Sequence, residues 1–151
     1  MNEWTDTDDW LGRVEAHRGP GEAAIARRIV AWCTERQLKH RGQGNEAHNK
    51  GITYMPIIPA IDWDPVPFTV TSKTGRVGLE GSSIGGKGRR PYGSESSFER
   101  LLGRLKAVPG VAQHKNTYPD IGLDLLVDEA TFASFFSVMD EVVRQIRRAN
   151  T

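Results

Sequence analysis

The chain has 151 residues and a mass of 16.8 kDa, with 38% hydrophobic residues, 26% charged residues and a formal net charge of +1. This length suits one globular domain, and the composition excludes a disordered or membranous chain. No apolar run approaches the roughly 20 residues of a membrane-spanning helix, and residues 1–10 lack the basic start and apolar stretch of a signal peptide. Cys33 is the only cysteine, which excludes an internal disulfide and favours a cytoplasmic location.

The small net charge hides an uneven distribution along the chain. Residues 1–24 carry −4, residues 25–115 carry +8 and residues 116–151 carry −3. Two interpretations remain open. The acidic ends fold back and neutralise the middle, or the basic middle forms a patch for phosphates whose affinity falls with salt.

The N-terminal part is predicted to be helical. Residues 1–18 are expected to form an acidic arm or short helix, with Thr7 as its cap and acids in the first turn. A single α+β domain is expected over residues 19–151. Its first helix spans about residues 20–38, because Pro20 suits a first helical position and an apolar stripe with helical spacing follows, formed by Ile25, Ile29, Trp32 and Cys33.

The middle of the chain favours strands. Residues 40–51 are polar and hold three glycines, which predicts a loop, and residues 52–58 are predicted to form a strand with Pro56 at an edge or bulge. Residues 68–72 and 76–80 predict a hairpin around a Lys-Thr-Gly turn. Residues 81–93 hold five glycines and predict an irregular basic loop.

The C-terminal third returns to helices. Ser96 and Glu99 resemble a capping box that starts a helix ending before Pro109. Short strands are expected at residues 111–114 and 118–123, and a long helix with a wide apolar face at about residues 128–148. The expected order is α-β-β-β-α-β-α, which is an α+β fold with a small, mostly antiparallel sheet packed against about three helices.

Two phosphate-related motifs are incomplete. Residues 81–88 match the phosphate-loop pattern GxxxxGK, but Gly88 stands where that loop needs Ser or Thr for magnesium. His48 and Lys50 begin like a phosphodiesterase signature, but Met55 occupies the carboxylate position. Both patterns therefore argue against a nucleotide-binding or phosphodiesterase site.

The sequence also lacks a complete set of residues for metal-dependent chemistry. Asp62 and Asp64 could supply the first carboxylate of a restriction-type nuclease core, but no acid precedes a strand lysine by two residues. The histidines, His17, His40, His48 and His114, have no ligand-like spacing. We therefore expect no metal, no cofactor and no catalytic residue, which favours a binding module.

Several segments together resemble a poorly characterised bacterial domain found at the C-terminal end of larger proteins of predicted restriction or defence type. The segments that carry the resemblance, within about residues 22–148, are residues 29–33, 39–44, 57–59, 68–70, 74–77, 101–111, 118–126 and 135–147. The resemblance implies a compact α+β module that recognises a ligand, with nucleic acid as the leading candidate. It implies no catalytic residue.

The sequence thus predicts a non-catalytic nucleic-acid-binding or accessory module of a bacterial defence or mobile-element system. Basic loops would contact phosphates, and Tyr92 would act as a stacking platform for a base. The basic residues expected to bind are Lys39, Arg41, Lys50, Lys73, Arg76, Lys87, Arg89 and Arg90.

Two alternatives remain. In the first, the protein is a protein-interaction module of immunity or inhibitor type, in which Trp4 and Trp10 of the acidic arm contact a partner, although such tryptophans also pack onto their own domain. In the second, it is a small nuclease or hydrolase in which Asp62, Asp64 and Glu80 converge, where like charges would perturb each other's pKa.

Overall fold

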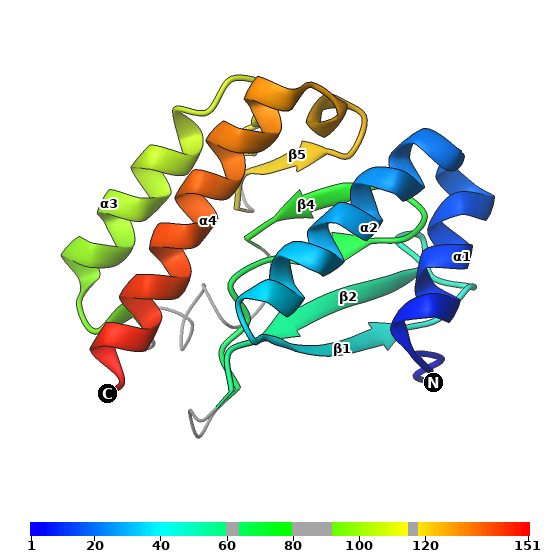
Figure 1. Cartoon of the computed structure of the whole chain (residues 1–151), viewed down its shortest axis with the longest axis horizontal. Helices are drawn as coiled ribbons and strands as arrows, with labels where there is room; N and C mark the ends of the chain where they lie inside the picture. The colour runs from blue at the N-terminus through cyan, green and yellow to red at the C-terminus, as the bar shows by residue number, and fades with distance from the viewer. Residues whose placement is uncertain (60–63, 80–91, 115–117) are drawn as a thin grey trace.

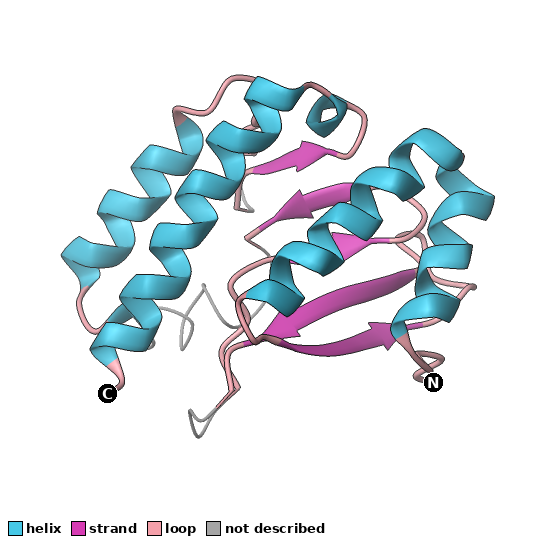
Figure 2. Cartoon of the chain, in the orientation of Figure 1, coloured by secondary structure: helices cyan, strands magenta, loops and turns pink. Residues whose placement is uncertain are grey.

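The computed structural model describes residues 1–59, 64–79, 92–114 and 118–151. Within these residues the fold is α+β, with four α-helices and a five-stranded antiparallel sheet (Figure 1, Figure 2). In chain order the elements are α1 (Thr7–Arg18), α2 (Pro20–Glu35), β1 (Lys39–Gly44), β2 (Ile52–Ile57), β3 (Thr69–Thr71), β4 (Arg76–Gly78), α3 (Glu95–Lys106), β5 (Asp120–Gly122), a 3-10 turn η2 (Leu125–Val127) and α4 (Glu129–Ala149). The α+β class is confirmed, whereas the predicted order lacked one helix and one strand.

Side-chain caps define the helix starts. The carboxylate of Asp6, rather than the predicted Thr7, accepts from Asp9 N at 2.8 Å and caps α1. Asp128 caps α4 by accepting from Thr131 N at 2.9 Å, at the start of the long helix predicted from about residue 128. The cap of helix α3 lies two residues earlier than predicted, because Ser94 and not Ser96 accepts from the backbone of the first turn.

Strand β1 corrects the prediction of a loop over residues 40–51. All six of its residues pair with β2, from Lys39 opposite Ile57 to Gly44 opposite Ile52. The segment KHRGQG has no β-branched or aromatic residue, so its own propensity does not indicate a strand. The pairing with β2 therefore imposes the extended conformation, and only residues after Gly44 form the connecting turn.

The predicted hairpin is confirmed as β3 and β4. They pair through Val70 and Val77, and Gly75 in the turn has a φ of +60°, which a glycine adopts without strain. The last expected strand is β5, which pairs with β4. The strand expected at residues 111–114 is reduced to one bridge, between Ala112 and Asp120.

Helices α1 and α2 pack on one face of the sheet, α4 runs beside the strands next to η2, and α3 packs against the outer side of α4 (Figure 1). Trp32 of α2 contacts both Phe68 before β3 and Phe136 of α4, with ring centroids 5.8 Å and 5.0 Å apart. Arg28 and Arg36 of α2 each form a hydrogen-bonded ion pair with an acid of α4. The core therefore lies between the helices and this face of the sheet.

The acidic N-terminal segment belongs to the same core. Trp10 of α1 is 1% exposed, and its indole Nε1 donates to the carbonyl of Ile52 in β2 at 2.8 Å. Before α1, the backbone N of Glu3 donates to the carbonyl of Gly44 and extends the edge of β1. Residues 1–18 thus contribute packing and strand-edge contacts to the rest of the chain.

Candidate nucleic-acid interface

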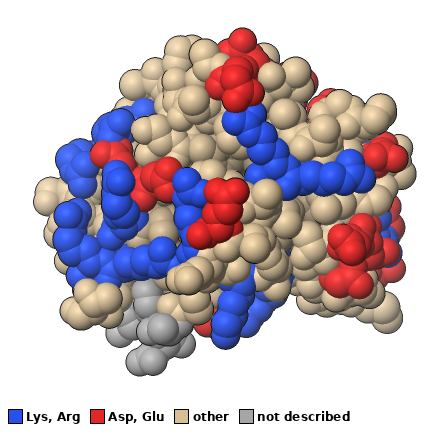
Figure 3. Space-filling model, in the orientation of Figure 1, with Lys and Arg blue, Asp and Glu red and all other residues tan. Residues whose placement is uncertain are grey.

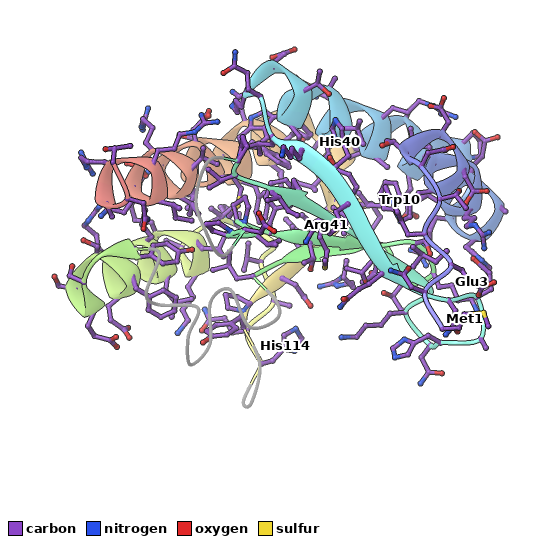
Figure 4. All side chains as sticks on the ribbon, turned by 90° about the horizontal axis from the view of Figure 1, so that it is seen from below. Met1, Glu3, Trp10, His40, Arg41 and His114 are labelled. Atoms are coloured by element: carbon purple, nitrogen blue, oxygen red, sulfur yellow. The ribbon has the colours of Figure 1, made fainter. Side chains whose placement is uncertain are left out.

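Three of the predicted contact residues lie on the second face of the sheet, away from the helices. Tyr54 of β2 faces the helices, where its ring lies 5.0 Å from that of Trp10. Because side chains alternate along a strand, the registers place Lys39 and Arg41 of β1, and Arg76 of β4, on the opposite face. Figure 4, seen from below, labels Arg41 on the side of β1 that points away from helices α1 and α2. The structure therefore brings residues from separate parts of the sequence to one surface.

Both arginines of this second face already have carboxylate partners. Arg41 Nη2 lies 3.3 Å from Asp64 Oδ2, and both side chains are about half exposed. Arg76 Nη2 donates to Asp120 Oδ1 at 2.5 Å, and His114 Nε2 lies 3.1 Å from the same oxygen. A phosphate would have to compete with these carboxylates for each guanidinium.

The two lysines near the hairpin take different positions. Lys73 Nζ donates to the backbone carbonyl of Glu46. Lys50 lines the same small cleft as Arg76, about 90 Å³ in volume, together with Thr71 and Tyr118. Lys50 and Arg76 are thus brought together as a pair, but the cleft also contains the Asp120 carboxylate.

Of the remaining predicted contact residues, one is exposed and three lie outside the described residues. Lys39 is exposed and forms no ion pair within the part of the chain that the structure describes. Lys87, Arg89 and Arg90 lie outside the described residues. The same holds for two of the three acids whose convergence would indicate a nuclease or hydrolase, Asp62 and Glu80.

The position of Tyr92 does not agree with the predicted stacking role. Its side chain is 1% exposed, and its ring packs edge-to-face against Phe98 with centroids 5.4 Å apart. Burial is the main cause that raises the pKa of its hydroxyl, which has no hydrogen-bond partner among the described residues. A buried ring offers no face on which a base could stack.

The tryptophans of the N-terminal segment pack onto the domain itself. Trp10 is buried, and the Trp4 ring lies 6.5 Å from Trp10 and 6.1 Å from Tyr54. This packing agrees with the interpretation of an arm folded onto its own domain. A partner could reach Trp10 only after this segment had left the sheet.

A basic surface that the sequence analysis did not select lies on α3 and α4. The two helices run antiparallel: Gln145 of α4 donates to the carbonyl of Tyr92 before α3, and Arg104 of α3 forms an ion pair with Glu141 of α4. Figure 3 shows Lys and Arg side chains gathered over these helices, at the left of the view, with Asp and Glu side chains among them. We call this surface the α3–α4 basic face and define it by Arg100, Arg104, Arg144 and Arg148.

The arginines of the α3–α4 basic face differ from those of the sheet in their partners. Only Arg104 has a carboxylate partner there, whereas Arg148 Nη2 donates to the neutral amide oxygen of Gln145 at 2.6 Å. Arg100 and Arg144 are exposed and form no ion pair within the described ranges. The sequence signal was present: each helix carries two arginines four residues apart, off its apolar stripe.

The single cysteine is buried beside Tyr54 in the core and is not part of a reactive site. Tyr54 OH lies 2.6 Å from His40 Nδ1, and His40 Nε2 lies 3.2 Å from Thr34 Oγ1. Cys33 is fully buried, and burial raises the pKa of its thiol to about 12. The thiol therefore stays protonated near neutral pH, which makes it a poor nucleophile.

The described residues contain no group of three His, Cys, Asp or Glu side chains placed to hold a metal ion. Their helices are also too short or too polar to cross a membrane. No family model matches the chain, and neither a curated protein nor a solved structure does. The resemblance to a defence-associated bacterial domain stays an expectation from the sequence.

Proposed function

We propose that this protein is a non-catalytic nucleic-acid-binding or accessory module that contacts phosphates through the α3–α4 basic face. The observation that carries the proposal is the contrast in charge pairing. Arg100, Arg144 and Arg148 face solvent without a carboxylate partner in the described residues, whereas Arg41 and Arg76 are each paired with an aspartate. The assignment to a bacterial defence or mobile-element system rests on the sequence resemblance alone.

Unpaired arginines favour phosphate binding for an electrostatic reason. A guanidinium that contacts a phosphate releases counterions from the nucleic acid. Log affinity falls as log salt rises, and each neutralised phosphate makes that slope steeper by about 0.9. An arginine that already contacts a carboxylate must first give up that interaction. Within the described residues, a phosphate that binds Arg100, Arg144 or Arg148 therefore meets less competition from carboxylates than one that binds Arg41 or Arg76.

The test removes three charges from each surface in turn. The variant Arg100→Gln/Arg144→Gln/Arg148→Gln changes the proposed face, and glutamine has a helix propensity close to that of arginine. The matched control, Lys39→Gln/Arg41→Gln/Lys50→Gln, removes three charges from the region predicted by the sequence. Fluorescence anisotropy with a labelled oligonucleotide, over a series of salt concentrations, gives the affinity and the salt slope of each protein.

We expect the α3–α4 variant to lose affinity and to lower the salt slope by about one per arginine removed. The control should retain most of the affinity of the unchanged protein. The proposed interface is wrong if the control loses the binding instead. The proposed function itself is wrong if the unchanged protein binds no oligonucleotide even at low salt.

A further inference from the structure

The α3–α4 basic face presents its charges as two rows. Arg100 and Arg104 are four residues apart on α3, and so are Arg144 and Arg148 on α4. Four residues of an α-helix span about 6 Å along the axis, and packed helices lie about 8–10 Å apart. Each row therefore repeats over one helical turn, and the two rows are separated by the width of a helix pair.

The antiparallel packing sets the rows side by side. Arg104 meets Glu141 at one end of the contact, and at the other end a Cβ on Gly93 would lie 3.0 Å from the Cβ of Ala149. Because the helices are antiparallel, the turn of α3 before Arg104 packs beside the turn of α4 after Glu141. Arg100 is therefore level with the turn that carries Arg144 and Arg148.

The same surface offers no platform for unpaired bases. The large hydrophobic side chains that are exposed in the described ranges are Met1, Leu125 and Val127, and none of them is aromatic. Tyr92, the aromatic residue that precedes α3, is buried against Phe98 within that helix. Proteins that bind single strands without sequence preference combine basic grooves with aromatic stacking worth about 1–3 kcal/mol per base.

We infer that the α3–α4 basic face binds the backbone of a double-stranded nucleic acid, with Arg100 of α3 on one strand and Arg144 and Arg148 of α4 on the other, across a groove. This inference rests on the proposed function. A duplex presents two rows of phosphates, and the grooves of B-form DNA are about 6 Å and 12 Å wide, on either side of the spacing of the two helices. Arginine side chains are long enough to adjust that spacing to the phosphates on both strands.

The experiment compares ligands that carry equal charge. A duplex of about 20 base pairs and an oligothymidylate of about 40 nucleotides hold nearly the same number of phosphates. Each competes with a labelled duplex for the full-length protein at low salt, read by fluorescence anisotropy. The two rows are then tested separately with Arg100→Gln and with Arg144→Gln/Arg148→Gln, whose folding is checked by circular dichroism.

We expect the duplex to compete at roughly fivefold lower concentration, because each contact releases more counterions from a duplex than from a single strand (slopes of about 0.9 and 0.7). Either row variant should reduce this preference toward equal competition. Oligothymidylate that competes as well as the duplex, or better, would overturn the inference while the proposed function stands. Binding of neither ligand would overturn the proposed function and the inference with it.

Discussion

Gly42 in β1 provides a sharp test of how the N-terminal segment docks on the sheet. A Cβ at this position would lie 2.2 Å from Trp4 Cε3 and 2.8 Å from the backbone oxygen of Thr53. Both separations are shorter than a Cβ tolerates, so Gly42→Ala requires the Trp4 ring to move. The indole thus occupies the space that any larger residue at position 42 would need.

The magnitude follows from the contacts that Trp4 would lose. Its ring packs against Trp10 and Tyr54, and each aromatic pair contributes about 0.5–1.5 kcal/mol beyond burial. Together with the strain of an added methyl group, Gly42→Ala should lower the free energy of unfolding by about 1–3 kcal/mol. For a chain of this size, each kcal/mol lowers Tm by about 2–4 °C.

A double-mutant cycle isolates the contribution of the indole. Chemical denaturation is measured for the unchanged protein, Gly42→Ala, Trp4→Ala and the double variant. Without the indole, the added methyl no longer meets the two Trp4 ring atoms and still meets the Thr53 oxygen, so Gly42→Ala should cost less in the Trp4→Ala background. An equal cost in both backgrounds would refute the docking of Trp4 over Gly42.

The three remaining predictions concern buried or capping side chains. Cys33, with its raised pKa, should react with a thiol reagent only on unfolding, and reaction of the native protein at the rate of a free thiol would contradict its burial. Burial lowers the pKa of His40 from 6.5, so below this pH the unfolded chain binds a proton that the folded chain does not. Unfolding free energy should therefore fall as the pH drops through about 6.5, and His40→Gln should remove part of that fall; an unchanged pH profile would refute this. Ser94→Ala should lower the free energy of unfolding by about 0.5–2 kcal/mol in a denaturant titration, because it removes the cap of α3, and Ser96→Ala should lower it less. The reverse order would show that Ser96 is the cap, as the sequence predicted.

The packing of the N-terminal segment also bears on the protein-interaction alternative. Deletion of residues 1–18 would take Trp10 and Val14, both buried, out of the core. Loss of a partner after that deletion would then report unfolding rather than a lost contact surface. Trp4→Ala is the better probe of a tryptophan contact, because Trp4 is only partly buried.

Local sequence signals located several elements correctly. Pro20 starts α2, Asp128 caps α4, and Gly75 allows the turn between β3 and β4. Each of these signals acts within a few residues of its own position, so the local sequence is enough to place the start of the helix or the turn. The end of α2 shows the limit: the helix stops at Glu35, before Gln37 takes a φ of +61°, whereas the apolar pattern continues to residue 38.

The candidate site was harder to predict, because it depends on which charges meet across the fold. Nothing in the local sequence shows that Asp120 would neutralise Arg76, 44 residues earlier, or that Asp64 would pair with Arg41. Tyr92 likewise stands beside a glycine-rich basic segment in the sequence, which suggested exposure. Its burial follows from the packing of its ring against Phe98 in α3.

By itself, the sequence determined the α+β class, the hairpin and the amphipathic helices, because periodicity, turn residues and caps act over a few residues. The tertiary structure alone decided that residues 39–44 form an edge strand, since that segment is extended only through its six pairs with β2. It also decided which arginines keep their charge available, since ion pairs such as Arg76–Asp120 and Arg104–Glu141 join residues that lie far apart in the chain. The net charge of +1 therefore does not show which charges are available to a ligand, because only the folded chain determines which of them form ion pairs.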